Sequence, residues 1–492
     1  MSDIRTLYQQ SASYLFGLAG VALLGFISFP LFTRILPVAE YGVLNLVTRT
    51  LLLVLVISKL GIQQSVVRFY EECRASTDPL ALVRYYSTLY CASSGLAILC
   101  ALLFAVAIWA APESWISATV RKPMLGAAVL VFTSTMTGLL MSFFRAAGRT
   151  GAFACVQIGV KAATVILVTI LLFQWQRTAS AFVAGSIVAE LGAVVILTVS
   201  LLQTGRVRLA GFDPGFLKQT LVFGLPLLLS ELSSMLHDSG ARILINAYLG
   251  AVPLAYYSAA YNLAWYCQEL IMAPLNLALI PMFVKLWTNQ GKAATQDFLR
   301  RVLNDILLIG FLVVAGAAVC ARDAMILLAS RKYEQAADLF PILVAGLMTY
   351  TVVPVFYAGL YFQKRTWTVA RVVFGACLVN LGLNLVLLPR LGVMGAVYAA
   401  LASYGTLLVS TAHASLKILP ISIPWASCGR YLLAGAIAIA AATPLRFPYP
   451  VVSIAIRGFV VVCVYVAVLW PLDAHFRKRL KTCYQEGRSL LS

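Results

Sequence analysis

The chain has 492 residues, of which 61% are hydrophobic and only 11% are charged. This composition excludes a soluble protein and predicts an all-α polytopic membrane protein. The net charge of +19 is spread over short loops, so we expect attraction to lipid headgroups and no nucleic-acid partner. Ten scattered cysteines without a CxxC spacing, with only three histidines, predict no disulfide framework, no metal site and no cofactor.

Apolar runs of about 20 residues recur along the whole chain, and each is long enough for one transmembrane helix. We count fourteen, centred near residues 23, 55, 97, 134, 162, 190, 233, 268, 311, 349, 378, 404, 437 and 462. The N-terminal residues lack a basic region and a cleavage site, so we expect the first run to be retained as a helix. Lys and Arg are more than twice as frequent in the segments on the side of the two termini, which predicts cytoplasmic termini.

The first six predicted helices carry several charges inside apolar surroundings. The first helix, from Tyr14 to Thr33, is followed by Arg34 at an outer turn, and the second helix carries Arg49 and Lys59. Lys161 lies near the middle of the fifth predicted helix and Glu190 near the middle of the sixth. A charge at a helix centre costs roughly 2.5–3.5 kcal/mol on insertion scales, so each should face a partner or a wet cavity.

The segment from 219 to 250 is the most polar of the predicted spans. Spacings of seven and four residues place Glu231, Asp238 and Arg242 on one face of its helix. Asp238 and Arg242 are separated by one turn and can form an ion pair. Such a pair either fixes helices in register or forms part of the polar wall of a transport pathway, and the sequence leaves both interpretations open.

Two further charges follow in the second half of the chain: Glu269 within its predicted span and Arg371 close to the cytoplasmic interface. The deep charges are thus four bases and four acids, namely Arg49, Lys59, Lys161, Arg242, Glu190, Glu231, Asp238 and Glu269. They could neutralise one another completely, so a structural ion pair is the alternative to a functional role for every one of them.

An internal repeat organises the chain. A shift of 216 residues places Pro37–Tyr41 on Pro253–Tyr257 and Arg149-Thr150 on Arg365-Thr366. We therefore expect two six-helix lobes of the same orientation, at residues 1–205 and 206–417, with a cleft between them. Residues 418–492 should form the last two helices and a basic cytoplasmic tail.

The motif FPLFTRILP at 29–37 with EYG at 40–42, and FGLP at 223–226 followed by Asp238, resemble a known family. The resemblance is to the polysaccharide-transport branch of the MOP exporter superfamily, the Wzx-like flippases. It implies a V-shaped carrier of two lobes in the bacterial inner membrane, with the cleft between the lobes. This carrier would move an undecaprenyl-diphosphate-linked oligosaccharide to the outer leaflet by alternating access. The product would serve O-antigen, capsule or exopolysaccharide synthesis, with the bilayer and polysaccharide polymerase or assembly proteins as partners.

From these observations we assign roles to the buried charges. The expected substrate-binding residues are the bases Arg34, Arg49, Lys59, Lys161, Arg242 and Arg371, because an anionic headgroup needs cationic hosts. The expected ion-coupling residues are the acids Asp238, Glu231, Glu190 and Glu269. Since the chain has no nucleotide-binding motif, an ion gradient or the membrane potential should drive transport.

Three alternatives to this flippase function remain. The first is a MATE-like exporter of drugs or small amphiphiles, for which an acid-rich cavity would be expected. The second is a flippase for lipid II. The third is a membrane enzyme, which is disfavoured because the chain has no Ser/His/Asp grouping and no long outer loop, so we expect no catalytic residues.

Overall fold

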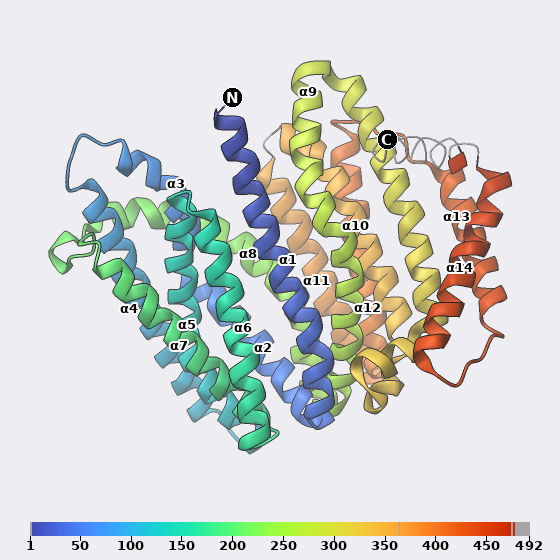
Figure 1. The fold of residues 1–492 in the computed structure, drawn as a ribbon, viewed down its shortest axis with the longest axis horizontal. Coiled ribbons are helices and arrows are strands. Elements are labelled where there is room, and N and C mark those ends of the chain that lie inside the picture. The colour runs from blue at the N-terminus through green and yellow to red at the C-terminus, as the bar shows by residue number, and fades with distance from the viewer. Residues whose placement is uncertain (1, 364, 474–475, 478–492) are drawn as a thin grey trace. The chain divides into compact units, whose positions relative to one another are not determined.

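The computed structural model describes residues 2–363, 365–473 and 476–477, and these residues form helices and connecting turns without a β-strand (Figure 1). The predicted all-α fold is therefore confirmed. Contacts divide the chain into two compact units, Met1–Ala255 and Tyr256–Ser492. The lobe boundaries near 205 and 417 stay a prediction. The basic tail expected at the C-terminus lies outside the described residues, except for 476–477.

Unit 1 is built from α1 to α8. Their bounds are Ser2–Ile35, Val38–Lys59, Ile62–Arg74, Ala81–Ala110, Ala118–Ala146, Thr150–Gln174, Ala179–Leu202 and Pro214–Leu249, with a 3-10 turn at Leu209–Gly211. Helix α5 lies at the centre of this unit, because it packs against α2, α3, α4 and α7. Helix α6 packs against both α7 and α1, and α8 packs against α2, α3 and α4.

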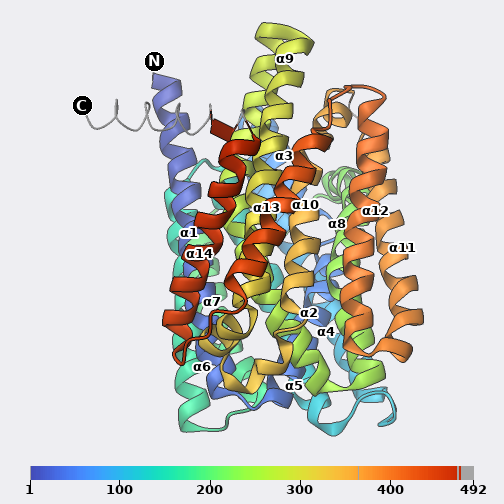
Figure 2. The ribbon, with the colours of Figure 1, turned by 90° about the vertical axis from the view of Figure 1, so that its right-hand side faces the viewer.

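Unit 2 contains most of α9 and the helices α10 to α14. Their bounds are Ala251–Ala324, Phe340–Phe362, Thr366–Leu391, Val393–Leu416, Trp425–Ala442 and Pro450–Leu472, with short helical turns at Met325–Ala329 and Arg331–Ala336. Helix α12 packs against both α10 and α11 (Figure 2). Gly291 has φ 80° and interrupts the helical backbone of α9, so α9 consists of two helical halves.

The membrane character of the chain is evident in its helices. Twelve helices of the described part are long and apolar enough to cross a membrane, and Ala19–Ile35 in α1 is a shorter apolar segment. The chain is therefore a multi-pass membrane protein. The predicted count of fourteen spans is not confirmed and stays a prediction. The predicted spans near residues 268 and 311 fall in the two halves of α9.

The local geometry at equivalent positions supports the predicted repeat. Arg149 precedes α6 with φ −84° and ψ 61°, and Arg365 precedes α11 with φ −82° and ψ 57°. The Arg149 amide donates to the Phe144 carbonyl at 3.0 Å, and the Arg365 amide donates to the Leu360 carbonyl at 3.0 Å. All of these pairs are separated by the same 216 residues that relate the two halves of the sequence.

Candidate functional site: a polar cluster between α2 and α8

A close backbone approach positions the candidate site within unit 1. Gly61, at φ 72°, ends the turn between α2 and α3, and a Cβ atom there would lie 2.3 Å from the Gly224 carbonyl oxygen of α8. Ser65 donates a hydrogen bond to the Thr220 carbonyl at 3.0 Å. These contacts hold α8 directly against α2 and α3, so the charged faces of α2 and α8 meet.

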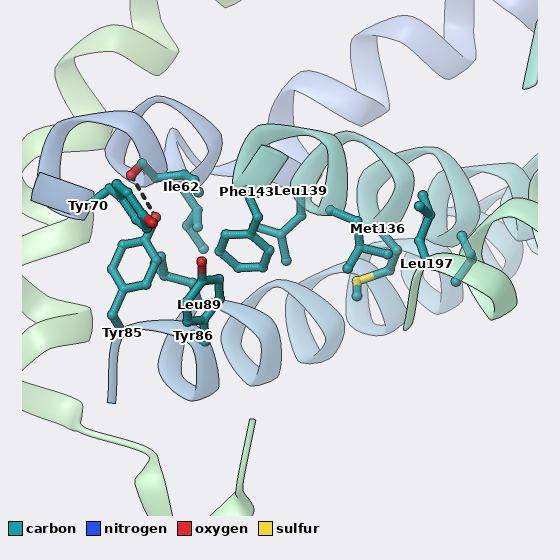
Figure 3. Packing of buried hydrophobic residues seen from close by; sticks show 12 residues of the cluster. Ile62, Tyr70, Tyr85, Tyr86, Leu89, Met136, Leu139, Phe143 and Leu197 are labelled. Atoms are coloured by element: carbon teal, nitrogen blue, oxygen red, sulfur yellow. Dashed lines mark hydrogen bonds between the residues drawn. The ribbon is translucent and has the colours of Figure 1, made fainter. Parts of the chain in front are cut away.

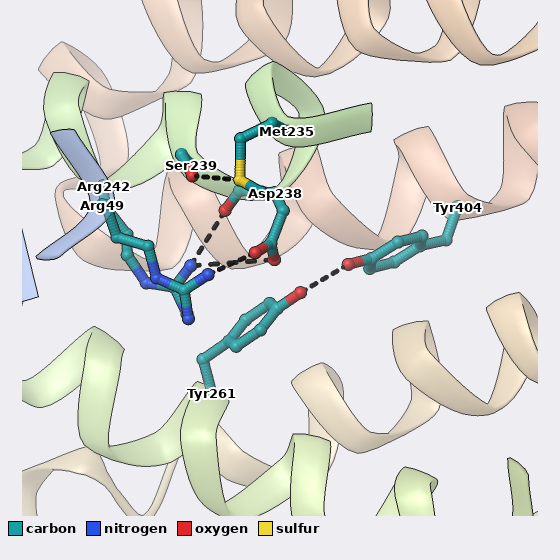
Figure 4. Close-up of polar contacts among 7 residues, drawn as sticks. All are labelled: Arg49, Met235, Asp238, Ser239, Arg242, Tyr261 and Tyr404. Atoms are coloured by element: carbon teal, nitrogen blue, oxygen red, sulfur yellow. Dashed lines mark hydrogen bonds and ion pairs between the residues drawn. The ribbon is translucent and has the colours of Figure 1, made fainter. Parts of the chain in front are cut away.

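Asp238 on α8 is the centre of this cluster (Figure 4). Its carboxylate forms a hydrogen-bonded ion pair with the Arg49 guanidinium of α2. Arg242 Nη1 lies 3.7 Å from Asp238 Oδ1 and donates to the Asp238 backbone carbonyl at 2.9 Å. Asp238 therefore has two cationic neighbours, of which sequence spacing predicted only Arg242.

A second group of contacts lies two turns earlier on α8. Glu231 Oε2 accepts a hydrogen bond of 2.8 Å from Gln64 Nε2 of α3, and Glu231 Oε1 lies 3.9 Å from Lys59 Nζ of α2. The predicted common face of Glu231, Asp238 and Arg242 thus points toward α2 and α3. Gln64 could not be singled out from the sequence, because an uncharged amide in a polar helix such as α3 gives no distinctive signal.

Among the described contacts of the cluster, bases outnumber acids. Three bases (Arg49, Lys59 and Arg242) contact two acids (Asp238 and Glu231), which leaves one net positive charge. The Arg242 side chain is 0% exposed, whereas those of Arg49 and Asp238 are 18% and 36% exposed. The Arg49–Asp238 pair is thus only partly buried, whereas Arg242 is packed within the helices.

Glu190 on α7 has a different environment from that of the cluster. Its Oε2 atom accepts hydrogen bonds from Thr133 Oγ1 at 2.7 Å and Ser134 Oγ at 2.6 Å, both on α5. The carboxyl group is therefore held by two hydroxyl donors, and no described ion pair includes it. Neither hydroxyl was identified from the sequence, since Ser and Thr in helices commonly bond to their own backbone, as Thr164 does here.

The remaining predicted site residues lie on other helices. Arg34 is exposed in the last turn of α1, and Lys161 is half-buried on α6. In unit 2, Glu269 is half-buried on α9, and Arg371 is exposed on α11 with its Nε atom 3.4 Å from the Trp367 carbonyl. Within unit 1 the structure thus brings together five of the predicted residues, and their assigned roles stay predictions.

A family model described as polysaccharide biosynthesis protein matches residues 7–287, which is more than half of the chain and includes the whole cluster. The chain belongs to this family. A comparison of the sequence with curated proteins found no significant match. The predicted resemblance to the polysaccharide-transport flippases is thereby confirmed at the level of the family.

Solved structures show which fold this family member shares. The lipid II flippase MurJ, in an inward closed conformation, has a TM-score of 0.76 at 12% identity, covering 95% of this chain and 99% of that chain. An inward-facing MATE multidrug transporter of the MOP superfamily has a TM-score of 0.58 at 14% identity, covering 89% and 94%. A MOP superfamily transporter from Pyrococcus furiosus has a TM-score of 0.52 at 13% identity, covering 89% and 96%. The predicted MOP exporter fold is confirmed.

Proposed function

We propose that the protein is a flippase that moves a lipid-linked oligosaccharide, built on undecaprenyl diphosphate, from the cytoplasmic to the outer leaflet. The observation that carries the proposal is the cluster around Asp238, which has more bases than acids inside membrane-spanning helices of a polysaccharide biosynthesis family member. A diphosphate cannot cross hydrocarbon without cationic hosts, and a partly exposed cluster with net positive charge can provide them.

The geometry supports a specific exchange at this cluster. The headgroup phosphate competes with the Asp238 carboxylate for the more exposed Arg49, and the buried Arg242 keeps the site positive during the exchange. Asp238, once released, takes up a proton or a sodium ion, and this couples transport to an ion gradient or to the membrane potential. Lys59 and Glu231 form a looser acid–base contact of 3.9 Å two turns away.

Two other transport functions have specific support. The fold similarity to MurJ favours lipid II, which would place the protein in cell-wall rather than surface polysaccharide synthesis. The MATE fold favours a drug or small-amphiphile exporter, but a cation exporter is expected to have an excess of acids, and the cluster has an excess of bases. We place the protein in the bacterial inner membrane with both termini in the cytoplasm, acting beside a polysaccharide polymerase or assembly proteins.

The experiment that tests the function is deletion of the gene followed by analysis of glycans. We expect loss of one surface polysaccharide and accumulation of its undecaprenyl-diphosphate-linked unit on the inner leaflet. Complementation with the wild-type chain should restore the polysaccharide. Accumulation of lipid II would identify the lipid II function, and unchanged glycans with increased drug sensitivity would identify an exporter.

A further inference from the structure

A separate concave site lies in unit 1, at the end where α4 begins and α5 and α7 end. It encloses about 380 Å³, within the range of roughly 300–1,000 Å³ that is usual for ligand pockets. Its floor is formed by the buried side chains of Tyr70, Tyr86, Phe143 and Leu197 (Figure 3). The Tyr86 and Phe143 rings pack edge to face, with centroids 4.8 Å apart, and so stabilise this floor.

Three arginines form the rim of this pocket: Arg74, Arg149 and Arg206. None of the described residues that line the pocket is acidic. Arg74 Nη1 lies 3.4 Å from Glu71 in an exposed pair, which is weak. The Arg206 guanidinium lies over the Tyr86 ring, with Cζ 5.7 Å from the centroid. The pocket therefore combines an apolar floor with an excess of positive charge at its mouth.

The backbone around the rim is fixed by hydrogen bonds. The amide of Arg208 donates to Ser87 Oγ at 2.9 Å, and the amide of Asp213 donates to Thr88 Oγ1 at 2.9 Å. These two bonds attach the linker between α7 and α8 to α4, and so hold Arg206 above Tyr86. Arg149 is fixed by its own amide bond to Phe144 at the start of α6. These bonds fix the backbone of the rim, whereas the side chains of Arg74, Arg149 and Arg206 are exposed at the mouth and accessible to a ligand.

We propose that this pocket binds the phosphate headgroup of an anionic phospholipid. Guanidinium groups present paired donors that match phosphate oxygens, and three of them surround one mouth. A lipid is favoured over a soluble phosphate because α7 carries exposed apolar side chains beside the rim residues Ser200 and Thr204. These are Ile196, Val199 and Leu202. They provide a surface for the acyl chains, and the site is independent of the proposed transport function.

The test uses the full-length protein in a neutral detergent and measures binding by titration calorimetry. The probe is dioctanoyl phosphatidylglycerol, with dioctanoyl phosphatidylcholine and glycerol 3-phosphate as comparators. We expect Arg74→Gln, Arg149→Gln and Arg206→Gln each to weaken phosphatidylglycerol binding about fivefold, and the triple variant about a hundredfold. Arg177→Gln is the matched control, because Arg177 also lies over an aromatic ring, Phe173 at 5.9 Å, beyond the other end of α6.

The comparators separate a lipid site from other sites. Phosphatidylcholine and glycerol 3-phosphate should bind at least about tenfold more weakly than phosphatidylglycerol, since the first lacks net charge and the second lacks acyl chains. Unchanged phosphatidylglycerol affinity in a triple variant that elutes like the wild type would overturn the proposal. Equal affinity for glycerol 3-phosphate would also overturn it, since the pocket would then be a site for soluble phosphates.

Discussion

Arg49 and Asp238 are 189 residues apart in the sequence, yet their side chains form an ion pair that joins α2 to α8. Arg242 lies near the other oxygen of the same carboxylate, one helical turn along α8. One acid thus connects two bases of unequal exposure. The Asp238 side chain retains 36% exposure, so its carboxylate is not sealed from its surroundings. This exposure is the reason to expect that the pair opens during function.

The first prediction concerns Asp238→Asn. The variant removes the charge that the two arginines share, and for a partly exposed pair we expect a loss of about 1–2 kcal/mol in the free energy of unfolding, between the values for exposed and buried pairs. Transport should fall about tenfold or more, because a charge-assisted contact contributes about 1.5–3 kcal/mol. Thermal unfolding of the purified protein and complementation of the deletion strain measure the two effects.

Two further variants distinguish function from structure at this pair. The exchange Arg49→Asp with Asp238→Arg re-forms an ion pair between α2 and α8 but places an arginine beside the buried Arg242. It should therefore restore only part of the stability and none of the transport. Arg68→Gln, which breaks the exposed pair with Glu72 on α3, is the control and should leave both quantities unchanged. Full transport by the exchanged pair would show that Arg49 and Asp238 only hold α2 and α8 together.

The second prediction concerns Glu190→Gln. A glutamine oxygen can accept the same hydrogen bonds from Thr133 and Ser134, so the free energy of unfolding should change by less than about 0.5 kcal/mol. The variant cannot bind and release a proton, so transport should no longer respond to the ion gradient. Thr133→Val is the structural control, and we expect it to destabilise the protein by about 1–3 kcal/mol through the lost donor. Ion dependence that persists in Glu190→Gln would assign Glu190 a structural role.

Much of this arrangement could be predicted from the sequence. Hydropathy predicts the helices, and the 216-residue shift finds Arg149 and Arg365, whose backbones have matching conformations. Helical spacing places Glu231, Asp238 and Arg242 on one face. Charged residues in an apolar helix are costly, so this face could be recognised from the sequence.

Other parts of the site could not be predicted. The pairing of Arg49 with Asp238 depends on the close contact of Gly61 with Gly224, which is a tertiary feature. Glu190 is satisfied by hydroxyl groups of another helix, and serines and threonines are too common in such helices to be informative. Single-sequence patterns therefore identify charged faces, but they do not identify the partners of those faces.

The third prediction tests the contact that places α8 on α2 and α3. Gly61→Ala adds a Cβ atom 2.3 Å from the Gly224 carbonyl and forces a residue with a side chain to adopt φ 72°. Gly205→Ala is a matched control, since Gly205 has φ 67° and no neighbouring atom within 4 Å. The control should lose about 1–2 kcal/mol from the backbone conformation alone, and Gly61→Ala should lose clearly more. Equal losses in the two variants would mean that the close approach does not constrain the helices.

The fourth prediction concerns the attachment of α14 within unit 2. Asp323 at the end of α9 accepts hydrogen bonds from Ser453 Oγ at 2.6 Å and Arg457 Nη1 at 3.1 Å, and both charged side chains are about 15% exposed. Asp323→Asn leaves the Arg457 charge nearly buried without its acid, so we expect a loss of about 2–4 kcal/mol.

The neighbouring residue Arg322 provides the control, because its pair with Glu334 is at the surface and its side chain is 70% exposed. Arg322→Gln should cost less than about 1 kcal/mol. The double variant Asp323→Leu with Arg457→Met should recover most of the stability, since an apolar pair can replace a buried ion pair without leaving an uncompensated charge. Hydrogen exchange of α14 measures the effect locally. Equal protection of α14 in Asp323→Asn and in the wild type would show that apolar packing alone, such as that of Tyr465 and Leu469, holds this helix.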